Sequence, residues 1–114
     1  MALTLYGIPN CDTVKKARAW LAQEGRPVTF HDFRKDGLTR AKVEQWLAAV
    51  PADRLLNRRG TTWRKLDAAQ QARAESDLAG LLVDHPSLVK RPVIETGDAV
   101  LVGFTEAERA ALAG

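Results

Sequence analysis

The chain opens with an apolar segment that ends abruptly and passes directly into a helix. Residues 3–6 predict a short strand, which Gly7 and Pro9 end because glycine tolerates a positive φ and proline cannot donate to a strand ladder. An amphipathic helix is predicted to follow over residues 12–24. The only cysteine of the 114-residue chain, Cys11, lies between strand and helix. This junction restricts both the fold and the chemistry.

The helix and the strand expected after it complete a βαβ unit. Val14, Ala17 and Leu21 recur at helical spacing and predict a buried face. Gly25 is a suitable helix stop, and residues 28–33 alternate in the way that is typical of a second strand. A strand, a helix and a strand at this spacing normally form a parallel, right-handed crossover.

The central part of the chain, roughly residues 38–87, is predicted to be helical. One helix is expected before Pro51, and Thr61 or Thr62 is expected to cap a short helical turn. A further, uninterrupted helix is predicted to end at Pro86. Its apolar face comprises Ala74, Leu78, Leu81, Leu82 and His85.

Strands return near the C-terminal end. Residues 92–96 and 99–102 flank Gly97-Asp98, a two-residue Gly-X connection that suits a type II′ hairpin, so these strands should be antiparallel. Thr105 and Glu108 have the spacing of a capping box and predict a final helix.

The order β-α-β, helical insertion, β-β-α predicts an α/β, thioredoxin-like fold with a mixed sheet. We expect one domain over residues 1–114, with the insertion at 38–87. Ligands of such sheets gather at the carboxyl ends of parallel strands, and Cys11 follows the first strand at that end.

The composition fits a small globular protein. Hydrophobic residues make up 46% of the chain and charged residues 27%, which is typical of a folded domain and not of a disordered segment. The net charge of +3 suits small anionic substrates but lacks the polybasic signature of nucleic-acid binding. A lone cysteine excludes an internal disulfide, and no apolar run reaches membrane-spanning length. We therefore expect a cytoplasmic location, no membrane contact and no direct nucleic-acid binding.

The position of Cys11 indicates a nucleophile. A thiol at a helix N-terminus lies near unpaired backbone N–H groups and the positive end of the helix dipole, and both favour the thiolate. The alternative is a buried, inert cysteine, since free cysteines are often buried. His31 and His85 do not have metal-ligand spacing relative to Cys11, so no metal site is expected.

Three stretches carry a more specific signal. They are Tyr6-Gly7-Ile8-Pro9-Asn10-Cys11 followed by Lys15-Lys16-Ala17-Arg18-Ala19-Trp20-Leu21, then Asn57-Arg58-Arg59-Gly60-Thr61-Thr62-Trp63-Arg64-Lys65-Leu66, and finally His85-Pro86-Ser87-Leu88-Val89-Lys90-Arg91-Pro92. In this order they resemble the ArsC/Spx family of arsenate-reductase-like proteins, over nearly the whole chain. The YffB-type branch, small proteins proposed to be glutathione-dependent thiol reductases, is the most similar.

The resemblance assigns roles to individual residues. Cys11 matches the nucleophilic cysteine, and Arg59 and Arg91 match arginines that bind an anion. Pro92 matches a cis-proline that would present the backbone of Arg91 to a peptide-like thiol. Asn10, beside the nucleophile, is a candidate to hydrogen-bond the thiolate or to cap the helix. The alternative is that both arginines are solvated surface residues with no role in binding.

The function implied is a monothiol, glutathione-dependent thiol/disulfide reductase that uses Cys11. Because there is no second cysteine, the resolving thiol must come from solution, with glutathione as co-substrate or a glutaredoxin-like protein as partner. No bound cofactor is expected. Two alternatives stay open: arsenate reduction, and Spx-like binding to RNA polymerase without thiol catalysis. Arsenate reductases carry a further arginine after the hairpin, whereas this chain has none before Arg109, and Spx-type regulators carry Cys-x-x-Cys, where this chain has Val14.

Overall fold

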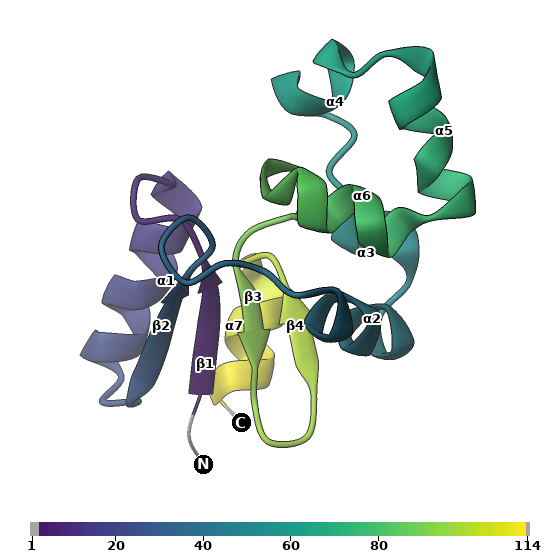
Figure 1. Ribbon diagram of the computed structural model, residues 1–114. Coiled ribbons are helices and arrows are strands. Elements are labelled where there is room, and N and C mark those ends of the chain that lie inside the picture. The colour runs from purple at the N-terminus through teal and green to yellow at the C-terminus, as the bar shows by residue number, and fades with distance from the viewer. Residues whose placement is uncertain (1–2, 114) are drawn as a thin grey trace. The chain divides into compact units, whose positions relative to one another are not determined.

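The computed structural model describes residues 3–113, which fall into two compact units. The first unit holds the chain up to Gly37 together with the chain from Arg91 onward, and the second spans Leu38–Lys90 (Figure 1). Within the described residues, every helix is too short or too polar to span a bilayer.

The first unit is built on a mixed four-stranded sheet. Its strands are β1 (Leu3–Gly7), β2 (Val28–Asp32), β3 (Val93–Glu95) and β4 (Val100–Val102), in the order β2-β1-β3-β4 (Figure 1). β1 is parallel to β2 and antiparallel to β3, which is itself antiparallel to β4. The parallel crossover, the antiparallel hairpin and the α/β, thioredoxin-like fold are thus confirmed. The type II′ turn predicted for the hairpin is wrong, because it needs a positive φ at Gly97 and, among the described residues, only Gly25, Gly37 and Gly103 have one.

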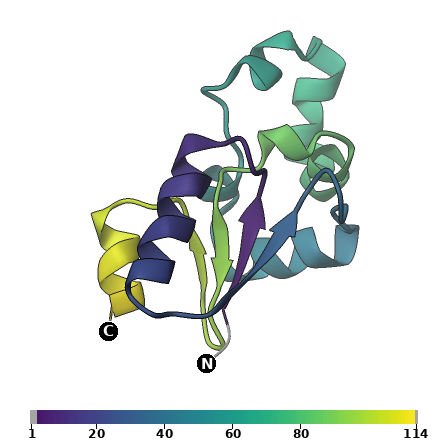
Figure 2. The same cartoon turned by 90° about the vertical axis from the view of Figure 1, so that its left-hand side faces the viewer.

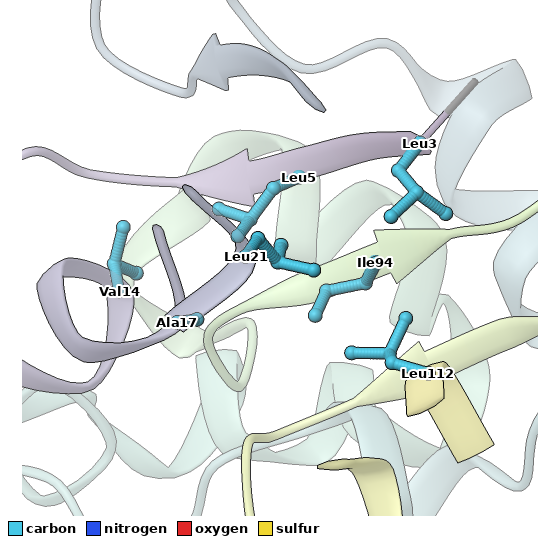
Figure 3. Close-up of a cluster of buried hydrophobic side chains, with 7 residues drawn as sticks. All are labelled: Leu3, Leu5, Val14, Ala17, Leu21, Ile94 and Leu112. Carbon is cyan, nitrogen blue, oxygen red and sulfur yellow. The ribbon is translucent and has the colours of Figure 1, made fainter. Parts of the chain in front are cut away.

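Two helices cover one face of this sheet and close the core. They are α1 (Asp12–Gln23) and α7 (Glu106–Ala113), which lie on the same side of the strands (Figure 2). The buried cluster beneath them comprises Leu3, Leu5, Val14, Ala17, Leu21, Ile94 and Leu112 (Figure 3). The face predicted for α1 is therefore confirmed. Burying each leucine contributes about 1.5–3 kcal/mol relative to exposure.

The ends of these two helices follow their local sequence. Gly25, just beyond α1, has a φ of +68°, a left-handed conformation that glycine adopts without strain. At the start of α7, the backbone N–H and the hydroxyl of Thr105 both donate to Glu108 Oε1 at 2.7 Å. The half of the predicted capping box in which Glu108 accepts the Thr105 N–H is thus formed.

The second unit is helical. Its elements are α2 (Arg40–Ala49), α3 (Ala52–Leu55), α4 (Thr61–Lys65), α5 (Ala68–Ser76), α6 (Leu78–Asp84) and a 3₁₀ turn, η1 (Pro86–Leu88). α6 packs against both α2 and α5. The buried residues of this second unit include Val43 and Trp46 of α2 and Leu81 and Leu82 of α6. A single antiparallel bridge between Leu56 and Val89 joins the two ends of the α3–η1 segment.

The prediction of one uninterrupted helix ending at Pro86 is wrong, because Asp77 divides it into α5 and α6. Asp77 has a φ of −156° and a ψ of 64°, outside the helical region. Its carboxylate accepts the backbone N–H of Gly80 at 3.4 Å and a hydrogen bond from Arg40 Nη2 at 2.7 Å. An aspartate that caps a new helix and meets an arginine of α2 is better satisfied than one inside a continuous helix.

The prediction that a threonine caps α4 is also wrong. Gly60 occupies the N-cap position with an extended backbone, and Thr61 is the first helical residue. An added Cβ at Gly60 would lie 3.2 Å from the side-chain amide of Asn57. The tight turn that Asn57 makes before α4 therefore favours glycine at the cap.

The Asp77 ion pair predicts a pH-dependent stability. The hydrogen bond from Arg40, followed by that from the Gly80 N–H, holds the pKa of Asp77 below its ordinary value of 3.8. A lowered native pKa stabilises the fold above that ordinary value, and the contribution is lost as the pH falls through the native pKa. Asp77→Asn should therefore lower the urea midpoint at pH 7, and its difference from wild type should shrink below about pH 4.

The matched control is Asp67→Asn, which replaces the N-cap of α5. Since asparagine also caps helices, this change removes a charge and leaves a good cap. Equal losses for the two variants, or a pH-independent loss for Asp77→Asn, would contradict the role given to the ion pair.

Candidate functional site

The end of β1 is fixed by a close approach between strand and helix. A Cβ added at Gly7 would lie 2.6 Å from Cγ2 of Val14, which is fully buried in α1. The Gly7 carbonyl accepts the backbone N–H of Phe33 at 2.9 Å, which ties the same point to the end of β2. Glycine is thus required where the chain leaves the sheet toward Cys11.

Cys11 closes the turn between β1 and α1. Its N–H donates to the Ile8 carbonyl at 3.3 Å, and its carbonyl accepts the N–H of Lys15 at 2.9 Å. It is the N-cap residue of α1, with an extended backbone of φ −90° and ψ 125°. Cys11 is half-buried at the edge of the core cluster of the first unit. It is therefore not deeply buried, which is what the alternative interpretation expects of an inert cysteine.

The cysteine occupies a capping position without capping. Within the described chain, its side chain makes no hydrogen bond to the first turn of α1. The first N–H groups of a helix have no intrahelical acceptor, so this end of α1 keeps its donors and positive dipole beside Cys11.

Asn10 does not cap α1, so the prediction of a capping role is wrong. The N-cap is Cys11, one residue further on, and Asn10 lies exposed in the preceding turn. The other role predicted for Asn10, contact with the thiolate or its ligand, stays a prediction.

Arg91 and Pro92 lie at the same edge of the sheet as the Cys11 turn. Tyr6 pairs with Val93 across β1 and β3, so Pro92 falls beside the end of β1. The Arg91–Pro92 peptide bond is cis, as the resemblance implies, and the buried Pro92 accepts the Gly103 N–H at 2.8 Å. Arg91 is half-buried. The sheet register thus brings Arg91 and Pro92 to the same end of the sheet as Cys11, which is far from them in the sequence.

Arg59 belongs to the second unit and lies in the turn before α4. Its N–H donates to Asn57 Oδ1 at 3.0 Å, and its carbonyl accepts from Arg64 Nη2 at 2.8 Å. The neighbouring Arg58 lies over the Trp63 ring at 5.1 Å. The backbone of Arg59 and the side chains of Arg58 and Arg64 thus make contacts within this turn and α4. The Arg59 side chain is exposed.

Most arginines of the chain have partners. The engaged ones are Arg18, Arg26, Arg40, Arg54, Arg58, Arg64, Arg73 and Arg109. Among residues 3–113, the side chains of Arg34, Arg59 and Arg91 have no hydrogen-bond, ion-pair or aromatic partner. Two of these three are the arginines that the resemblance assigns to an anion site. The third, Arg34, was not among the residues predicted for the site, and it follows the second parallel strand.

The histidines serve the fold of their own units. His31 packs against the Tyr6 ring with centroids 4.8 Å apart, and its Nε2 lies 2.7 Å from the Gly37 carbonyl oxygen. His85 follows the C-terminal end of α6. Over the described ranges, no three of the histidine, cysteine and carboxylate side chains are grouped to hold a metal ion.

Comparison with known proteins identifies relatives across the full length. The ArsC family model matches residues 6–112. The solved structure of a YffB protein is 44% identical with a TM-score of 0.89, covering 96% of each chain. An ArsC-related protein from Brucella melitensis is 45% identical with a TM-score of 0.76, covering 97% of this chain and 93% of that one. The global transcriptional regulator Spx of Staphylococcus saprophyticus is 31% identical over 108 residues, covering 93% of this chain and 82% of that protein.

The contact at Gly7 predicts a specific coupling. Gly7→Ala should lower the free energy of unfolding by about 1–3 kcal/mol, because the new methyl group overlaps the buried Val14 side chain. In a Val14→Ala background the same change should cost less than half as much. Urea unfolding of the four variants measures the difference. An equal cost in both backgrounds would show that the two side chains do not compete for space.

The unused cap at Cys11 predicts that a side chain able to accept a first-turn N–H would stabilise the fold. Serine at this position can accept a first-turn N–H, whereas alanine cannot. Cys11→Ser should therefore exceed Cys11→Ala in free energy of unfolding by about 1 kcal/mol, measured by urea unfolding. Equal stability of the two variants would mean that position 11 is not a functional N-cap position.

Proposed function

Since this chain belongs to the ArsC family, we propose that it acts as a monothiol, glutathione-dependent thiol/disulfide reductase with Cys11 as the nucleophile. The observation that carries the proposal is the place of Cys11, half-buried at the N-terminus of α1 and at the same end of the sheet as Arg91–Pro92. The glutathione-rich cytoplasm is the compartment in which we expect it to work.

The proposed cycle needs one protein thiol. The Cys11 thiolate attacks the glutathione sulfur of a mixed disulfide between glutathione and a substrate thiol. A bond forms between the Cys11 and glutathione sulfurs, the original S–S bond breaks, and the substrate leaves as a thiolate that takes a proton from water. A second glutathione thiolate then attacks the Cys11-bound glutathione sulfur. Oxidised glutathione departs and the Cys11 thiolate returns.

The resolving thiol is placed in solution because the chain offers none. Cys11 is the only cysteine, and the position three residues later is the buried Val14. A glutaredoxin-like protein is the alternative donor of that second thiol. In either case the enzyme needs no bound cofactor in this scheme.

The two arginines are assigned to the anionic groups of glutathione. Arginine keeps its charge at every physiological pH and can grip a carboxylate with two N–H groups. The side chains of Arg59 and Arg91 have no competing partner within the described chain, which supports this assignment. Asn10 and Pro92 complete the set of residues that we expect to touch the bound thiol.

Arsenate is the less favoured substrate. The resemblance to arsenate reductases requires an arginine after the hairpin, and the first one here is Arg109. Its guanidinium lies over the Phe104 ring at 5.5 Å, on α7. This arginine already has an aromatic partner, so it is a poor replacement for an anion-binding residue.

The similarity to Spx favours a second candidate, a regulator that binds RNA polymerase without thiol catalysis. The exposed Lys15 and Lys16 of α1 would contribute a basic surface for such a partner. Equal capture of polymerase from a lysate by the wild type and by Cys11→Ser, with no thiol chemistry at Cys11, would favour the regulator.

The enzyme proposal predicts a covalent adduct. Oxidised glutathione should add one glutathione to the wild-type protein and none to Cys11→Ser, as measured by intact mass. Arg59→Ala and Arg91→Ala should each slow this reaction by about tenfold, the value of one charge-assisted hydrogen bond. Lys65→Ala, which removes an exposed charge from α4, is the control and should react at the wild-type rate. A wild-type protein that stays unmodified would sink the proposal.

A further inference from the structure

We propose that Arg34 binds a carboxylate of the glutathione that reacts at Cys11, on the side of the Cys11 turn opposite Arg91. This inference rests on the proposed function and adds a substrate-binding residue to it. It comes from the order of the strands and from the charges left without partners in the first unit.

The loop that carries Arg34 leaves the sheet beside the Cys11 turn. Gly7 pairs with Asp32 across the parallel strands β1 and β2, and the Phe33 N–H donates to the Gly7 carbonyl at 2.9 Å. Neighbouring strands are about 4.8 Å apart. Because parallel strands end at the same edge, Arg34 and the Cys11 turn emerge together at the carboxyl ends of β2 and β1.

The strand order places the two arginines on opposite sides of the nucleophile. β1 lies between β2 and β3 in the sheet (Figure 1). Arg34 follows β2, whereas Arg91 precedes β3 at the same edge. The turn that carries Cys11 starts from the strand between them. This arrangement fits a ligand whose sulfur is central and whose negative charges lie to either side.

Glutathione has that distribution of charge. Its cysteine is the middle residue, and it carries one carboxylate on the glutamyl residue and another on the glycine. Arginine is the side chain best suited to each, since a guanidinium matches the planar carboxylate with two parallel hydrogen bonds. One arginine on each side of Cys11 would therefore orient the thiol as well as attract it.

The backbone around Arg34 is held by its acidic neighbours, which leaves the guanidinium free. Asp32 Oδ1 accepts the Arg34 N–H at 2.8 Å, and Asp36 Oδ2 accepts the Asp32 N–H at 3.1 Å. His31 Nε2 lies 2.7 Å from the Gly37 carbonyl oxygen at the far end of the loop. Both carboxylates thus face backbone donors, and the exposed Arg34 side chain has no acceptor within residues 3–113.

The test compares Arg34→Ala with Lys35→Ala, the matched control. Lys35 is the next residue of the same loop, exposed and with the same charge. Adduct formation at Cys11 is followed by intact mass with oxidised glutathione and with bis(2-hydroxyethyl) disulfide, which is neutral. Arg34→Ala should slow the glutathione reaction by about tenfold and leave the neutral reaction unchanged, because one charge-assisted interaction is lost. Lys35→Ala should change neither, and Arg34→Lys should recover part of the rate.

Two results would overturn the inference. One is an equal effect of Arg34→Ala and Lys35→Ala, which would mean that only the overall charge of the loop matters. The other is an equal slowing with both disulfides, which would mean that Arg34 acts on the turn or on the sulfur and not on a carboxylate.

A second readout separates this inference from the proposed function. The rate of Cys11 alkylation by iodoacetate, divided by that by neutral iodoacetamide, measures attraction of a carboxylate without any glutathione. Arg34→Ala should lower this ratio about threefold, whereas Lys35→Ala should leave it unchanged. If the wild type does not react with oxidised glutathione but Arg34→Ala still lowers the ratio, the reductase proposal is refuted and carboxylate binding by Arg34 is supported. An unchanged ratio would overturn the inference whatever glutathione does.

Discussion

The contact of Val14 with Gly7 is the constraint on which the remainder of the first unit depends. It presses the first turn of α1 against the end of β1, where no side chain larger than hydrogen fits. The helix start is thereby fixed relative to a strand that pairs on both sides. The groups of the first unit that are assigned to the site, Cys11, Arg34, Arg91 and Pro92, are located relative to that strand end. A loose junction would leave the sulfur without a defined relation to the charges around it.

The chemistry assigned to the site uses groups that the fold leaves unsatisfied. The N-terminal N–H groups of α1 receive no capping bond from Cys11, and three arginines have no partner within residues 3–113. Other polar side chains of the chain are hydrogen-bonded to one another, as Thr105 is to Glu108 and Arg40 is to Asp77. The proposed nucleophile thus occupies a position at which serine would stabilise the helix better. This is the usual relation between a functional site and the stability around it.

Membership of the family establishes the fold, but it leaves more than one function open. The relatives include both a transcriptional regulator and proteins related to arsenate reductases, all with similarity over most of the chain. What distinguishes these functions is a small number of side chains, because one fold can carry several chemistries. In this chain the informative features are the lone Cys11, the valine three residues later and the absence of an arginine between the hairpin and Arg109. They favour the proposed reductase, in which a second thiol from solution releases the group bound to Cys11.

The sequence by itself determined the local elements, because their signals lie within a few residues of one another. Hydrophobic periodicity predicted the buried face of α1, and Gly25 predicted where that helix ends. The spacing of Thr105 and Glu108 predicted the start of α7. Only the tertiary structure decided the break at Asp77, since its partner Arg40 is 37 residues away and no local pattern reveals it. The same holds for the site. Strand order and register, which arise from pairing between distant segments, placed Arg34 and Arg91 on either side of the Cys11 turn.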